Sequence, residues 1–529
     1  MYEENIIIKD WRNVDLTFGL VFPNQYELGL SSYTIRLLYF LINTVEKYVC
    51  ERIFLPKNIR FPASKDISSI NQLRSIENAV LPIDFDILGF SIHFENDVKN
   101  VLWILEKSDI PLKSQERNDS RIKNDSQYPL IIGGGPAITS NPLSLSKIFD
   151  LFFIGDAEPS LFHFLEKFSK FKLAGGNFTQ FLKEMKEIEG IFIPSLSNKV
   201  KRAILSNLDE SPNPIFQVIS KSSEEKKIFQ ENFMIEVNRG CPFQCKFCIS
   251  SFHNSPFRNR SYENILDVIE KVKKISTFVK VSLIGSCVSS HPKFYEICQY
   301  ILGNGLKFTL PSIRLEHLTP KVIRILEKGD IKTVTIAPET GSESLRYALG
   351  KKISNEKIFE VLKLLKRSTI KNIKFYFLIG LPNEKDEDLD DIIRILKEID
   401  QLGFEKGVLR ININPFVPKF NTPYEGEINN YLSDNIIELR RKFQKIEREL
   451  KKVVSIKLKF QNVKDILNNA RLQTILSLAD QKVADIFIDY YMNGANMGAL
   501  RRTEKELDFS IDEYLLKIKT GYRPWQLKI

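Results

Sequence analysis

The sequence predicts an α/β protein with a doubly wound, Rossmann-like N-terminal domain, then a partial (βα)6 barrel and a mainly helical C-terminal domain. Two successive alternations of short apolar runs with helical patterns predict this order, because such alternation favours parallel sheets covered by helices. From about Pro418 onward the pattern is mainly helical. The expected boundaries are 1–200 for the first domain, 201–232 for a linker, 233–417 for the barrel and 418–529 for the helical domain.

The first alternation contains five apolar runs that are typical of buried parallel strands. These runs are Leu16–Phe22, Arg52–Leu55, Ile87–His93, Leu130–Ile132 and Leu151–Ile154. Helical patterns at Tyr33–Val45 and Val98–Lys107 lie between them. We expect the polar stretch Lys113–Ser126 to be a surface insertion. Arg202–Asn232 is rich in Ser, Glu, Lys and Pro, which predicts the linker.

The second alternation is more regular and predicts an open barrel, whose chemistry would lie at the C-terminal ends of the strands. The expected strands are Met234–Val237, Lys280–Ile284, Lys307–Pro311, Thr333–Ala337, Lys374–Leu378 and Leu409–Ile413. The expected helices are Tyr262–Ile275, His291–Leu302, Pro320–Lys328, Ser344–Leu349 with Asn355–Lys366, and Lys385–Leu402. In the C-terminal part, the basic runs Arg440–Arg448 and Lys451–Lys459 are expected to be solvated helix faces.

Composition limits the class of protein. The chain has 529 residues, 43% of them hydrophobic, and a formal net charge of +10. The basic excess is modest, and a solvated lysine-rich surface explains it better than an anionic partner does. No apolar stretch approaches the roughly 18 residues of a membrane span, and the N-terminus lacks the pattern of a signal peptide. We therefore expect a cytoplasmic protein, with peripheral membrane contact left open.

The cysteines are the strongest functional signal. Three of the six, Cys241, Cys245 and Cys248, lie within eight residues and follow the first barrel strand. A disulfide framework would scatter cysteines in pairs, so a metal site in a reducing compartment fits better. Three thiolates can hold three irons of a 4Fe–4S cluster and leave the fourth iron open to a substrate. The alternative is a zinc site with His253 as fourth ligand.

The spacing C-x-x-x-C-x-x-C, with Phe247 before the third cysteine, resembles the radical S-adenosylmethionine (SAM) superfamily. The resemblance implies a 4Fe–4S cluster and SAM as cofactors, and it continues through the barrel strands. Gly285 and Ser286 would contact the methionyl amino group of SAM. Ser312 and Arg314 would reach its carboxylate or ribose, Glu339 its ribose, and Gly380 its adenine. Cys50 and Cys298 are expected to be core thiols, and packing is also the favoured role of Cys287.

The N-terminal domain resembles the cobalamin-binding domain that precedes many radical SAM barrels. The matching residues are Ser91, Gly133, Gly134, Gly135 and Gly155. Glycines at the ends of parallel strands let a large flat cofactor approach the backbone. The stretch Asn24–Gly29 departs from D-x-H-x-x-G, because Tyr26 replaces the histidine. The sequence therefore predicts either cobalamin without a protein histidine as lower ligand, or a domain that has lost cobalamin.

The resemblance implies an enzyme that makes a 5′-deoxyadenosyl radical and functionalises an unactivated carbon. Cobalamin-dependent C-methylation is the favoured outcome. The alternative reaction is C–C bond or ring formation on an archaeal-type tetraether lipid without methyl transfer. The substrate is left open between a lipid, an RNA base and a peptide side chain, and a reductant such as ferredoxin or flavodoxin is implied. The non-enzymatic alternative is a zinc- or cluster-bearing nucleic-acid-binding protein.

Overall fold

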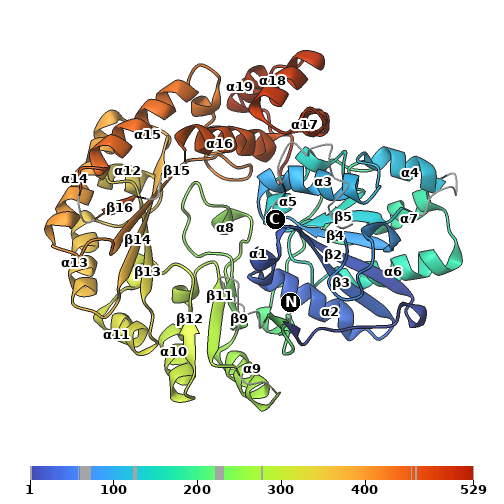
Figure 1. Ribbon diagram of the computed structural model, residues 1–529, viewed down its shortest axis with the longest axis horizontal. Helices are drawn as coiled ribbons and strands as arrows, with labels where there is room; N and C mark the ends of the chain where they lie inside the picture. Colours follow the sequence, from blue (N-terminus) through green and yellow to red (C-terminus); the bar gives the residue numbers. More distant parts are fainter. Residues whose placement is uncertain are drawn as a thin grey trace.

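The computed structural model confirms the α/β class and the expected order of a Rossmann-like sheet, an open barrel and a helical C-terminal part (Figure 1). It describes residues 3–57, 59, 73–122, 128–220, 232–275, 278–453, 456–458 and 462–527. Parts of the expected linker, of the polar stretch Lys113–Ser126 and of the basic run Lys451–Lys459 lie outside these residues.

The N-terminal part is built on one six-stranded sheet with the order β3-β2-β4-β5-β6-β7. All neighbours are parallel except β6 and β7, which run antiparallel. The strands are β2 (Leu16–Gln25), β3 (Tyr48–Leu55), β4 (Ile87–Ser91), β5 (Leu130–Gly134), β6 (Leu151–Phe153) and β7 (Ile191–Phe192).

Helices cover both faces of this sheet, which explains why its strands read as continuous apolar runs. Phe18 and Leu20 of β2 pack in one cluster with α2 (Tyr33–Thr44), α6 (Leu161–Ala174) and α7 (Phe178–Met185). Residues that point the other way pack against α3 (Val98–Lys107). Because successive side chains of a strand point to opposite faces of the sheet, each apolar run contributes residues to two hydrophobic cores.

The polar stretch Lys113–Ser126 lies at the surface in its described part, as predicted, but that part is a regular helix. Ser114–Ile122 form helix α4, and Arg117 within it is fully buried. The Arg117 guanidinium lies 3.1 Å from the carboxylate of Asp150 and donates to the carbonyl of Pro111 at 2.6 Å. The sequence gives no sign of this helix because the helix has no apolar face. Its one buried side chain is Arg117, a charged residue with an acidic partner.

The barrel is open. Its strands form two four-stranded sheets, in the orders β10-β9-β11-β12 and β13-β14-β15-β16, and among the described residues no ladder joins β12 to β13. All neighbours are parallel except β10 and β9. The strands are β9 (Phe233–Arg239), β10 (Arg258–Asn259), β11 (Lys280–Gly285), β12 (Lys307–Thr309), β13 (Thr333–Glu339), β14 (Asn372–Ile379), β15 (Leu409–Pro415) and β16 (Ile456–Leu458).

Each of the first five expected barrel strands is followed by its helix, as predicted. The helices are α9 (Tyr262–Ile275), α10 (Phe294–Gly303), α11 (Pro320–Lys328), α12 (Glu343–Ala348) with α13 (Asn355–Lys366), and α14 (Asp386–Gln401). Three short helices lie on loops: α1 (Tyr26–Leu30), α5 (Pro136–Ser140) and α8 (Ile249–Phe252). In the expected linker, β8 (Ile219–Ser220) pairs with β1 (Glu3–Glu4).

The C-terminal part is helical, as predicted, but its basic runs differ from the expectation. The helices are α15 (Ile436–Leu450), α16 (Val463–Leu478), α17 (Val483–Met492), α18 (Met497–Glu506) and α19 (Ile511–Lys519). On α15, Arg440 and Arg448 are exposed, whereas Lys442 is buried and lies 2.9 Å from the carboxylate of Glu384. The second basic run contains β16, which extends the barrel sheet beside β15.

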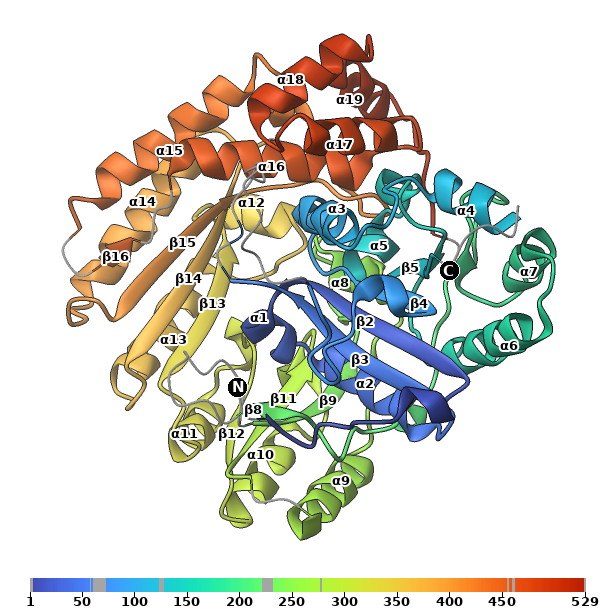
Figure 2. The same cartoon turned by 45° about the vertical axis from the view of Figure 1, so that its right-hand side comes forward.

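The C-terminal helices span the barrel and the N-terminal sheet, as the red segments of Figures 1 and 2 show. The Asn141 amide donates to three carbonyls at the end of α16, the shortest at 2.8 Å to Ala479. Trp525 is fully buried, and its ring centroid lies 5.2 Å from that of Phe192. The helical part therefore holds the other two parts together. No helix within the described ranges is long and apolar enough to cross a membrane.

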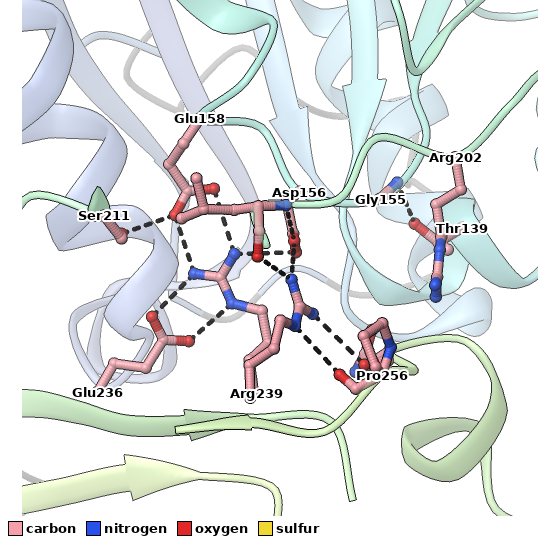
Figure 3. A network of polar contacts seen from close by, with 12 residues as sticks. Thr139, Gly155, Asp156, Glu158, Arg202, Ser211, Glu236, Arg239 and Pro256 are labelled. Atoms are coloured by element: carbon pink, nitrogen blue, oxygen red, sulfur yellow. Dashed lines mark hydrogen bonds and ion pairs between the residues drawn. The ribbon is translucent and has the colours of Figure 1, made fainter. Parts of the chain in front are cut away.

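A buried ion network, which we call the Arg239 clamp, joins β6 of the N-terminal sheet to β9 of the barrel (Figure 3). The Arg239 guanidinium lies between carboxylates from both parts, 2.9 Å from Asp156, 2.9 Å from Glu158 and 2.8 Å from Glu236. Arg258 approaches Asp156 from the other side at 2.5 Å. The clamp fixes how the two parts meet.

Burial alone would disfavour charge on these carboxylates. The attraction of Arg239 outweighs this cost, so the pKa values of Asp156 and Glu158 lie below their usual range. A depressed carboxylate pKa stabilises the fold at neutral pH, and this stabilisation is lost as the pH falls through the folded-state pKa.

Replacing Arg239 by methionine should lower the free energy of unfolding at pH 7 by about 3–5 kcal/mol, because buried carboxylates then lose their counter-ion. The deficit should shrink as the pH falls below about 4, where the ordinary carboxylate protonates. Denaturant unfolding over this pH range measures both effects. Lys170→Met is the control: its pair with Glu166 is exposed and solvent screens it, so stability should barely change. A deficit no larger than the control's would contradict the clamp.

Candidate active site

The cysteine loop begins directly after β9 and is held at both ends. Gly240 has φ of 80°, and a Cβ there would lie 2.4 Å from the carbonyl oxygen of Asn254, so only glycine fits. The Lys246 N–H donates to the carbonyl of Leu349 at 2.9 Å, which ties the loop to the segment after α12. Cys245 is buried, while Cys241 and Cys248 are half-buried.

Cations lie near the middle cysteine. Burial raises the pKa of the Cys245 thiol, while Lys351 and Arg314 act in the opposite direction. The Arg314 guanidinium also stacks 3.5 Å from the ring centroid of Phe243 inside the loop. Predicted site residue Arg314 therefore lies at the cysteines, where an anionic cluster would gain from its charge.

Cys287 lies beside the loop as well. A hydrogen bond with Cys287, followed by burial, raises the pKa of Cys241. The Cys287 sulfur lies 3.0 Å from the hydroxyl of Ser290, and the Asn238 amide donates to the Cys287 carbonyl at 2.9 Å. Cys287 therefore not only packs in the core, as expected, but also contacts the thiol of Cys241, a predicted iron ligand.

The donor set suits iron and sulfide, since three thiolates on one loop leave a cluster corner free. Within the described ranges, no group of three or more His, Cys, Asp or Glu side chains is arranged so that it could hold a metal ion. Cluster binding therefore requires the three thiols to adopt other side-chain rotamers that face a common centre. His253, the fourth ligand of the zinc alternative, is buried, and its Nε2 lies 2.7 Å from the carbonyl of Phe420.

A cavity of about 400 Å³ lies between the C-terminal edge of the N-terminal sheet and the ends of β9 and β11, and we call it the central cavity. Its volume is in the range of small-molecule sites. It brings together predicted residues from both halves of the chain, which are Ser91, Gly133, Gly134, Gly135, Gly155, Gly285 and Ser286. The Arg239 clamp forms part of its wall.

The cavity glycines have different structural roles. At Gly135 and Gly155, φ is 105° and 100°, and a Cβ would meet a backbone oxygen at 2.6 and 2.2 Å. A Cβ at Gly285 would lie 2.2 Å from the Asn238 side chain. Around Gly134, by contrast, the nearest atom would be 3.7 Å away. Gly134 is thus where the sheet edge leaves room for a ligand, while the others shape the backbone around it.

Five predicted residues lie away from the central cavity, namely Phe247, Ser312, Arg314, Glu339 and Gly380. Phe247 packs against the cluster of Leu345, Leu349, Leu381 and Phe416. Ser312 is exposed, and the Gly380 N–H donates to the carboxylate of Glu384 at 2.9 Å.

Glu339 is held by a cation. Its φ is 70°, which is unusual for glutamate, and its carboxylate lies 2.7 Å from the ammonium of Lys351. Lys351 also lies close enough to Cys245 to lower the pKa of its thiol. The Glu339–Lys351 ion pair therefore links the end of β13 to the cysteine loop.

Sequence reasoning missed His93, which lines the central cavity two residues after Ser91. It also missed the clamp, whose charges are distant in sequence. A signal for His93 was present, because a polar residue at the C-terminal end of a parallel strand faces the edge where ligands bind.

A second cavity, of about 700 Å³, lies where the ends of β2 and β15 meet α3 and α16. Side-chain amides dominate its polar lining: Asn24, Gln25, Asn96, Asn100, Asn414, Asn469 and Gln473. Burial raises the pKa of Asp97 in the same wall to about 7. We call it the amide cavity.

The chain matches two family models. Residues 34–194 match radical SAM proteins, N-terminal, and residues 235–396 match the radical SAM superfamily. An uncharacterized protein of Methanocaldococcus jannaschii is 26% identical over 503 residues, covering 95% of this chain and 96% of the relative. An uncharacterized methyltransferase of Pyrococcus horikoshii is 23% identical over 288 residues, covering 53% of this chain and 60% of the relative.

Solved structures share the fold at low identity. The radical SAM methyltransferase TsrM of Kitasatospora setae, with tryptophan and a SAM analogue bound, has a TM-score of 0.50 and 12% identity. The match covers 78% of this chain and 76% of TsrM. The cobalamin-dependent radical SAM enzyme OxsB with aqua-cobalamin has a TM-score of 0.50 and 15% identity, covering 96% of this chain and 78% of OxsB.

The two family models together match more than half of the chain, and the second contains the cysteine loop at the end of β9. This chain therefore belongs to the radical SAM superfamily of enzymes and carries an N-terminal domain that resembles the cobalamin-binding domain.

Proposed function

We propose that this radical SAM enzyme is a cobalamin-dependent methyltransferase that acts on an unactivated carbon of a polar substrate. One observation carries the proposal: a single cavity is lined by the residues predicted for the corrin and by Gly285 and Ser286, predicted for SAM. Methyl transfer needs both cofactors next to the same substrate carbon, and a shared cavity provides that proximity. The methyltransferase relative from P. horikoshii supports methyl transfer, and the cobalamin-dependent fold relative OxsB supports the cofactor.

The chain's own residues divide the work. Cys241, Cys245 and Cys248 would hold the cluster, which would supply the one electron that cleaves SAM into methionine and a 5′-deoxyadenosyl radical. Gly285 and Ser286 bind the methionyl end of SAM at the tip of β11. Arg314 neutralises negative charge beside Cys245. Lys351 holds one oxygen of Glu339, so that the other oxygen can accept a ribose hydroxyl.

The N-terminal residues receive the corrin. Gly134 lets the macrocycle approach the end of β5, and the Ser91 hydroxyl can donate to or accept from a polar group of the cofactor. When bound, cobalamin supplies a methyl group that a carbon radical can take up.

The amide cavity favours a polar substrate over the tetraether lipid. Some of these amides already have protein partners: Asn100 donates to Asp97, and Gln473 donates to Glu95. An apolar chain would leave any amide group without such a partner unpaired, at a cost in free energy. Asn96, which is buried, already has its Oδ1 without a hydrogen-bond partner. An RNA base or a peptide side chain can satisfy such a wall, and a hydrocarbon cannot.

Anaerobic reconstitution tests the cluster assignment. The wild-type chain should bind about four irons and release 5′-deoxyadenosine when SAM and a reductant are added. Cys245→Ala should lose most of the iron and all of the release, because two thiolates cannot hold the cluster in place. Cys298→Ala, which removes a buried thiol of α10, is the control and should keep both. If Cys245→Ala still releases 5′-deoxyadenosine, the assignment is wrong.

Corrin retention tests the cobalamin assignment. After growth with hydroxocobalamin, the purified wild-type protein should show corrin absorbance. Gly134→Leu should lose it while keeping its melting temperature, because the added side chain enters the space left at the end of β5. Gly303→Leu, at an exposed position with no atom within 4 Å of an added Cβ, should retain corrin.

Two results would contradict this version of the function. A wild-type protein that never retains corrin removes the methyltransferase proposal. Retention by Gly134→Leu at the wild-type level would place the corrin elsewhere in the molecule.

A further inference from the structure

His93 lies just beyond the end of β4 and lines the central cavity. Its Nε2 lies 3.2 Å from the hydroxyl oxygen of Ser91, and its ring meets that of Phe22 edge-on at 5.3 Å. These two contacts fix the orientation of the imidazole. The residue is surrounded by protein, yet its side chain remains exposed to the cavity space.

The hydrogen bond to Ser91 determines what the second ring nitrogen can do. Either atom of this contact can donate; in the tautomer in which Nε2–H donates to the Ser91 oxygen, Nδ1 carries the free lone pair. Metal-binding histidines typically have this arrangement, in which an oxygen holds the other N–H and sets the tautomer. The ordinary pKa of histidine already leaves the ring mostly neutral at pH 7, and the surrounding protein shifts the pKa of His93 further down, so a proton does not block the lone pair.

The position at which related domains place a histidine does not reach the cavity here. Tyr26 occupies it, is buried, and donates its hydroxyl to the carboxylate of Glu3 at 2.6 Å. Tyr26 is not part of the cavity wall. Of the described residues that line the cavity, His93 is the one histidine. The imidazole therefore comes from a different strand than the sequence motif would predict.

We propose that His93 is the axial nitrogen ligand of the cobalt of a corrin bound in the central cavity, with Ser91 as its positioning residue. The inference rests on the proposed cobalamin function and deepens it. It replaces the expectation that the corrin binds without a protein histidine. A nitrogen ligand from the protein would take the place of the cofactor's own nucleotide base and tune the reactivity of the cobalt.

Electron paramagnetic resonance of the holoenzyme with its cobalt reduced to Co(II) tests this directly. One coordinating ¹⁴N splits the cobalt lines into triplets. If the protein is produced with ¹⁵N-labelled histidine and unlabelled cobalamin, the triplets should become doublets, because ¹⁵N has a different nuclear spin. Persisting triplets would assign the ligand to the nucleotide base, and lines without nitrogen splitting would mean no nitrogen ligand. Either result overturns the inference and leaves corrin binding intact.

Variants give an independent test. His93→Phe keeps a ring of similar shape and should retain corrin but lose the histidine splitting, and added imidazole should restore a nitrogen triplet in His93→Ala. His163→Phe, at an exposed position on α6, is the control and should keep the wild-type spectrum. Unchanged splitting in His93→Phe would overturn the assignment. If the wild-type protein binds no corrin, the proposed function fails instead, which is a distinguishable result.

Discussion

The relation between the two halves of this molecule depends on one buried guanidinium. Arg239 is bound by carboxylates of the N-terminal sheet and of its own strand, and the first predicted iron ligand, Cys241, follows two residues later. A buried ion group of this kind contributes little net stability compared with apolar packing, but it is intolerant of a change in geometry. The clamp therefore specifies where the cysteine loop lies relative to the sheet edge that shapes the central cavity.

The C-terminal part adds a second connection on another side of the site. Lys419, which follows the last expected barrel strand, pairs with Glu95 of the N-terminal part and donates to Ser477 at 2.8 Å. Gln473 of α16 donates to the same glutamate at 2.9 Å. Together with the clamp, these contacts leave little freedom for the two halves to separate. A radical intermediate needs such enclosure, because contact with water or a wrong partner would destroy it.

Much of the fold could be predicted because its strands are buried on both faces and its glycines lie at strand ends. The apolar run Leu16–Phe22 and the Gly133–Gly135 turn show this in the sequence itself. The failures have a shared cause. Arg117 and Lys442 are charged residues that lie inside because a carboxylate pairs with them, and a hydropathy pattern does not report a partner distant in the chain. Strand β16 was missed because its sequence is basic.

In the candidate site, too, features that lie within one segment could be predicted and features formed by distant segments could not. The cysteine triplet is local, so its spacing alone indicates its chemistry. The central cavity is not local: it forms only when the end of β4 meets the end of β11, and no pattern within either segment reports that meeting. His93 was hidden for this reason, while Ser91 beside it could be matched to a known motif. The amide cavity, assembled from five separate segments, had no sequence signal at all.

Three consecutive residues after β4 face three different surroundings. His93 borders the central cavity, Phe94 borders the amide cavity, and Glu95 is bound by Lys419 and Gln473. The three residues are joined by two peptide bonds, so one short segment carries contacts to both cavities and to the C-terminal part. A substitution that displaces the backbone of this tripeptide would therefore alter the lining of both cavities and the contact with the C-terminal helices at the same time.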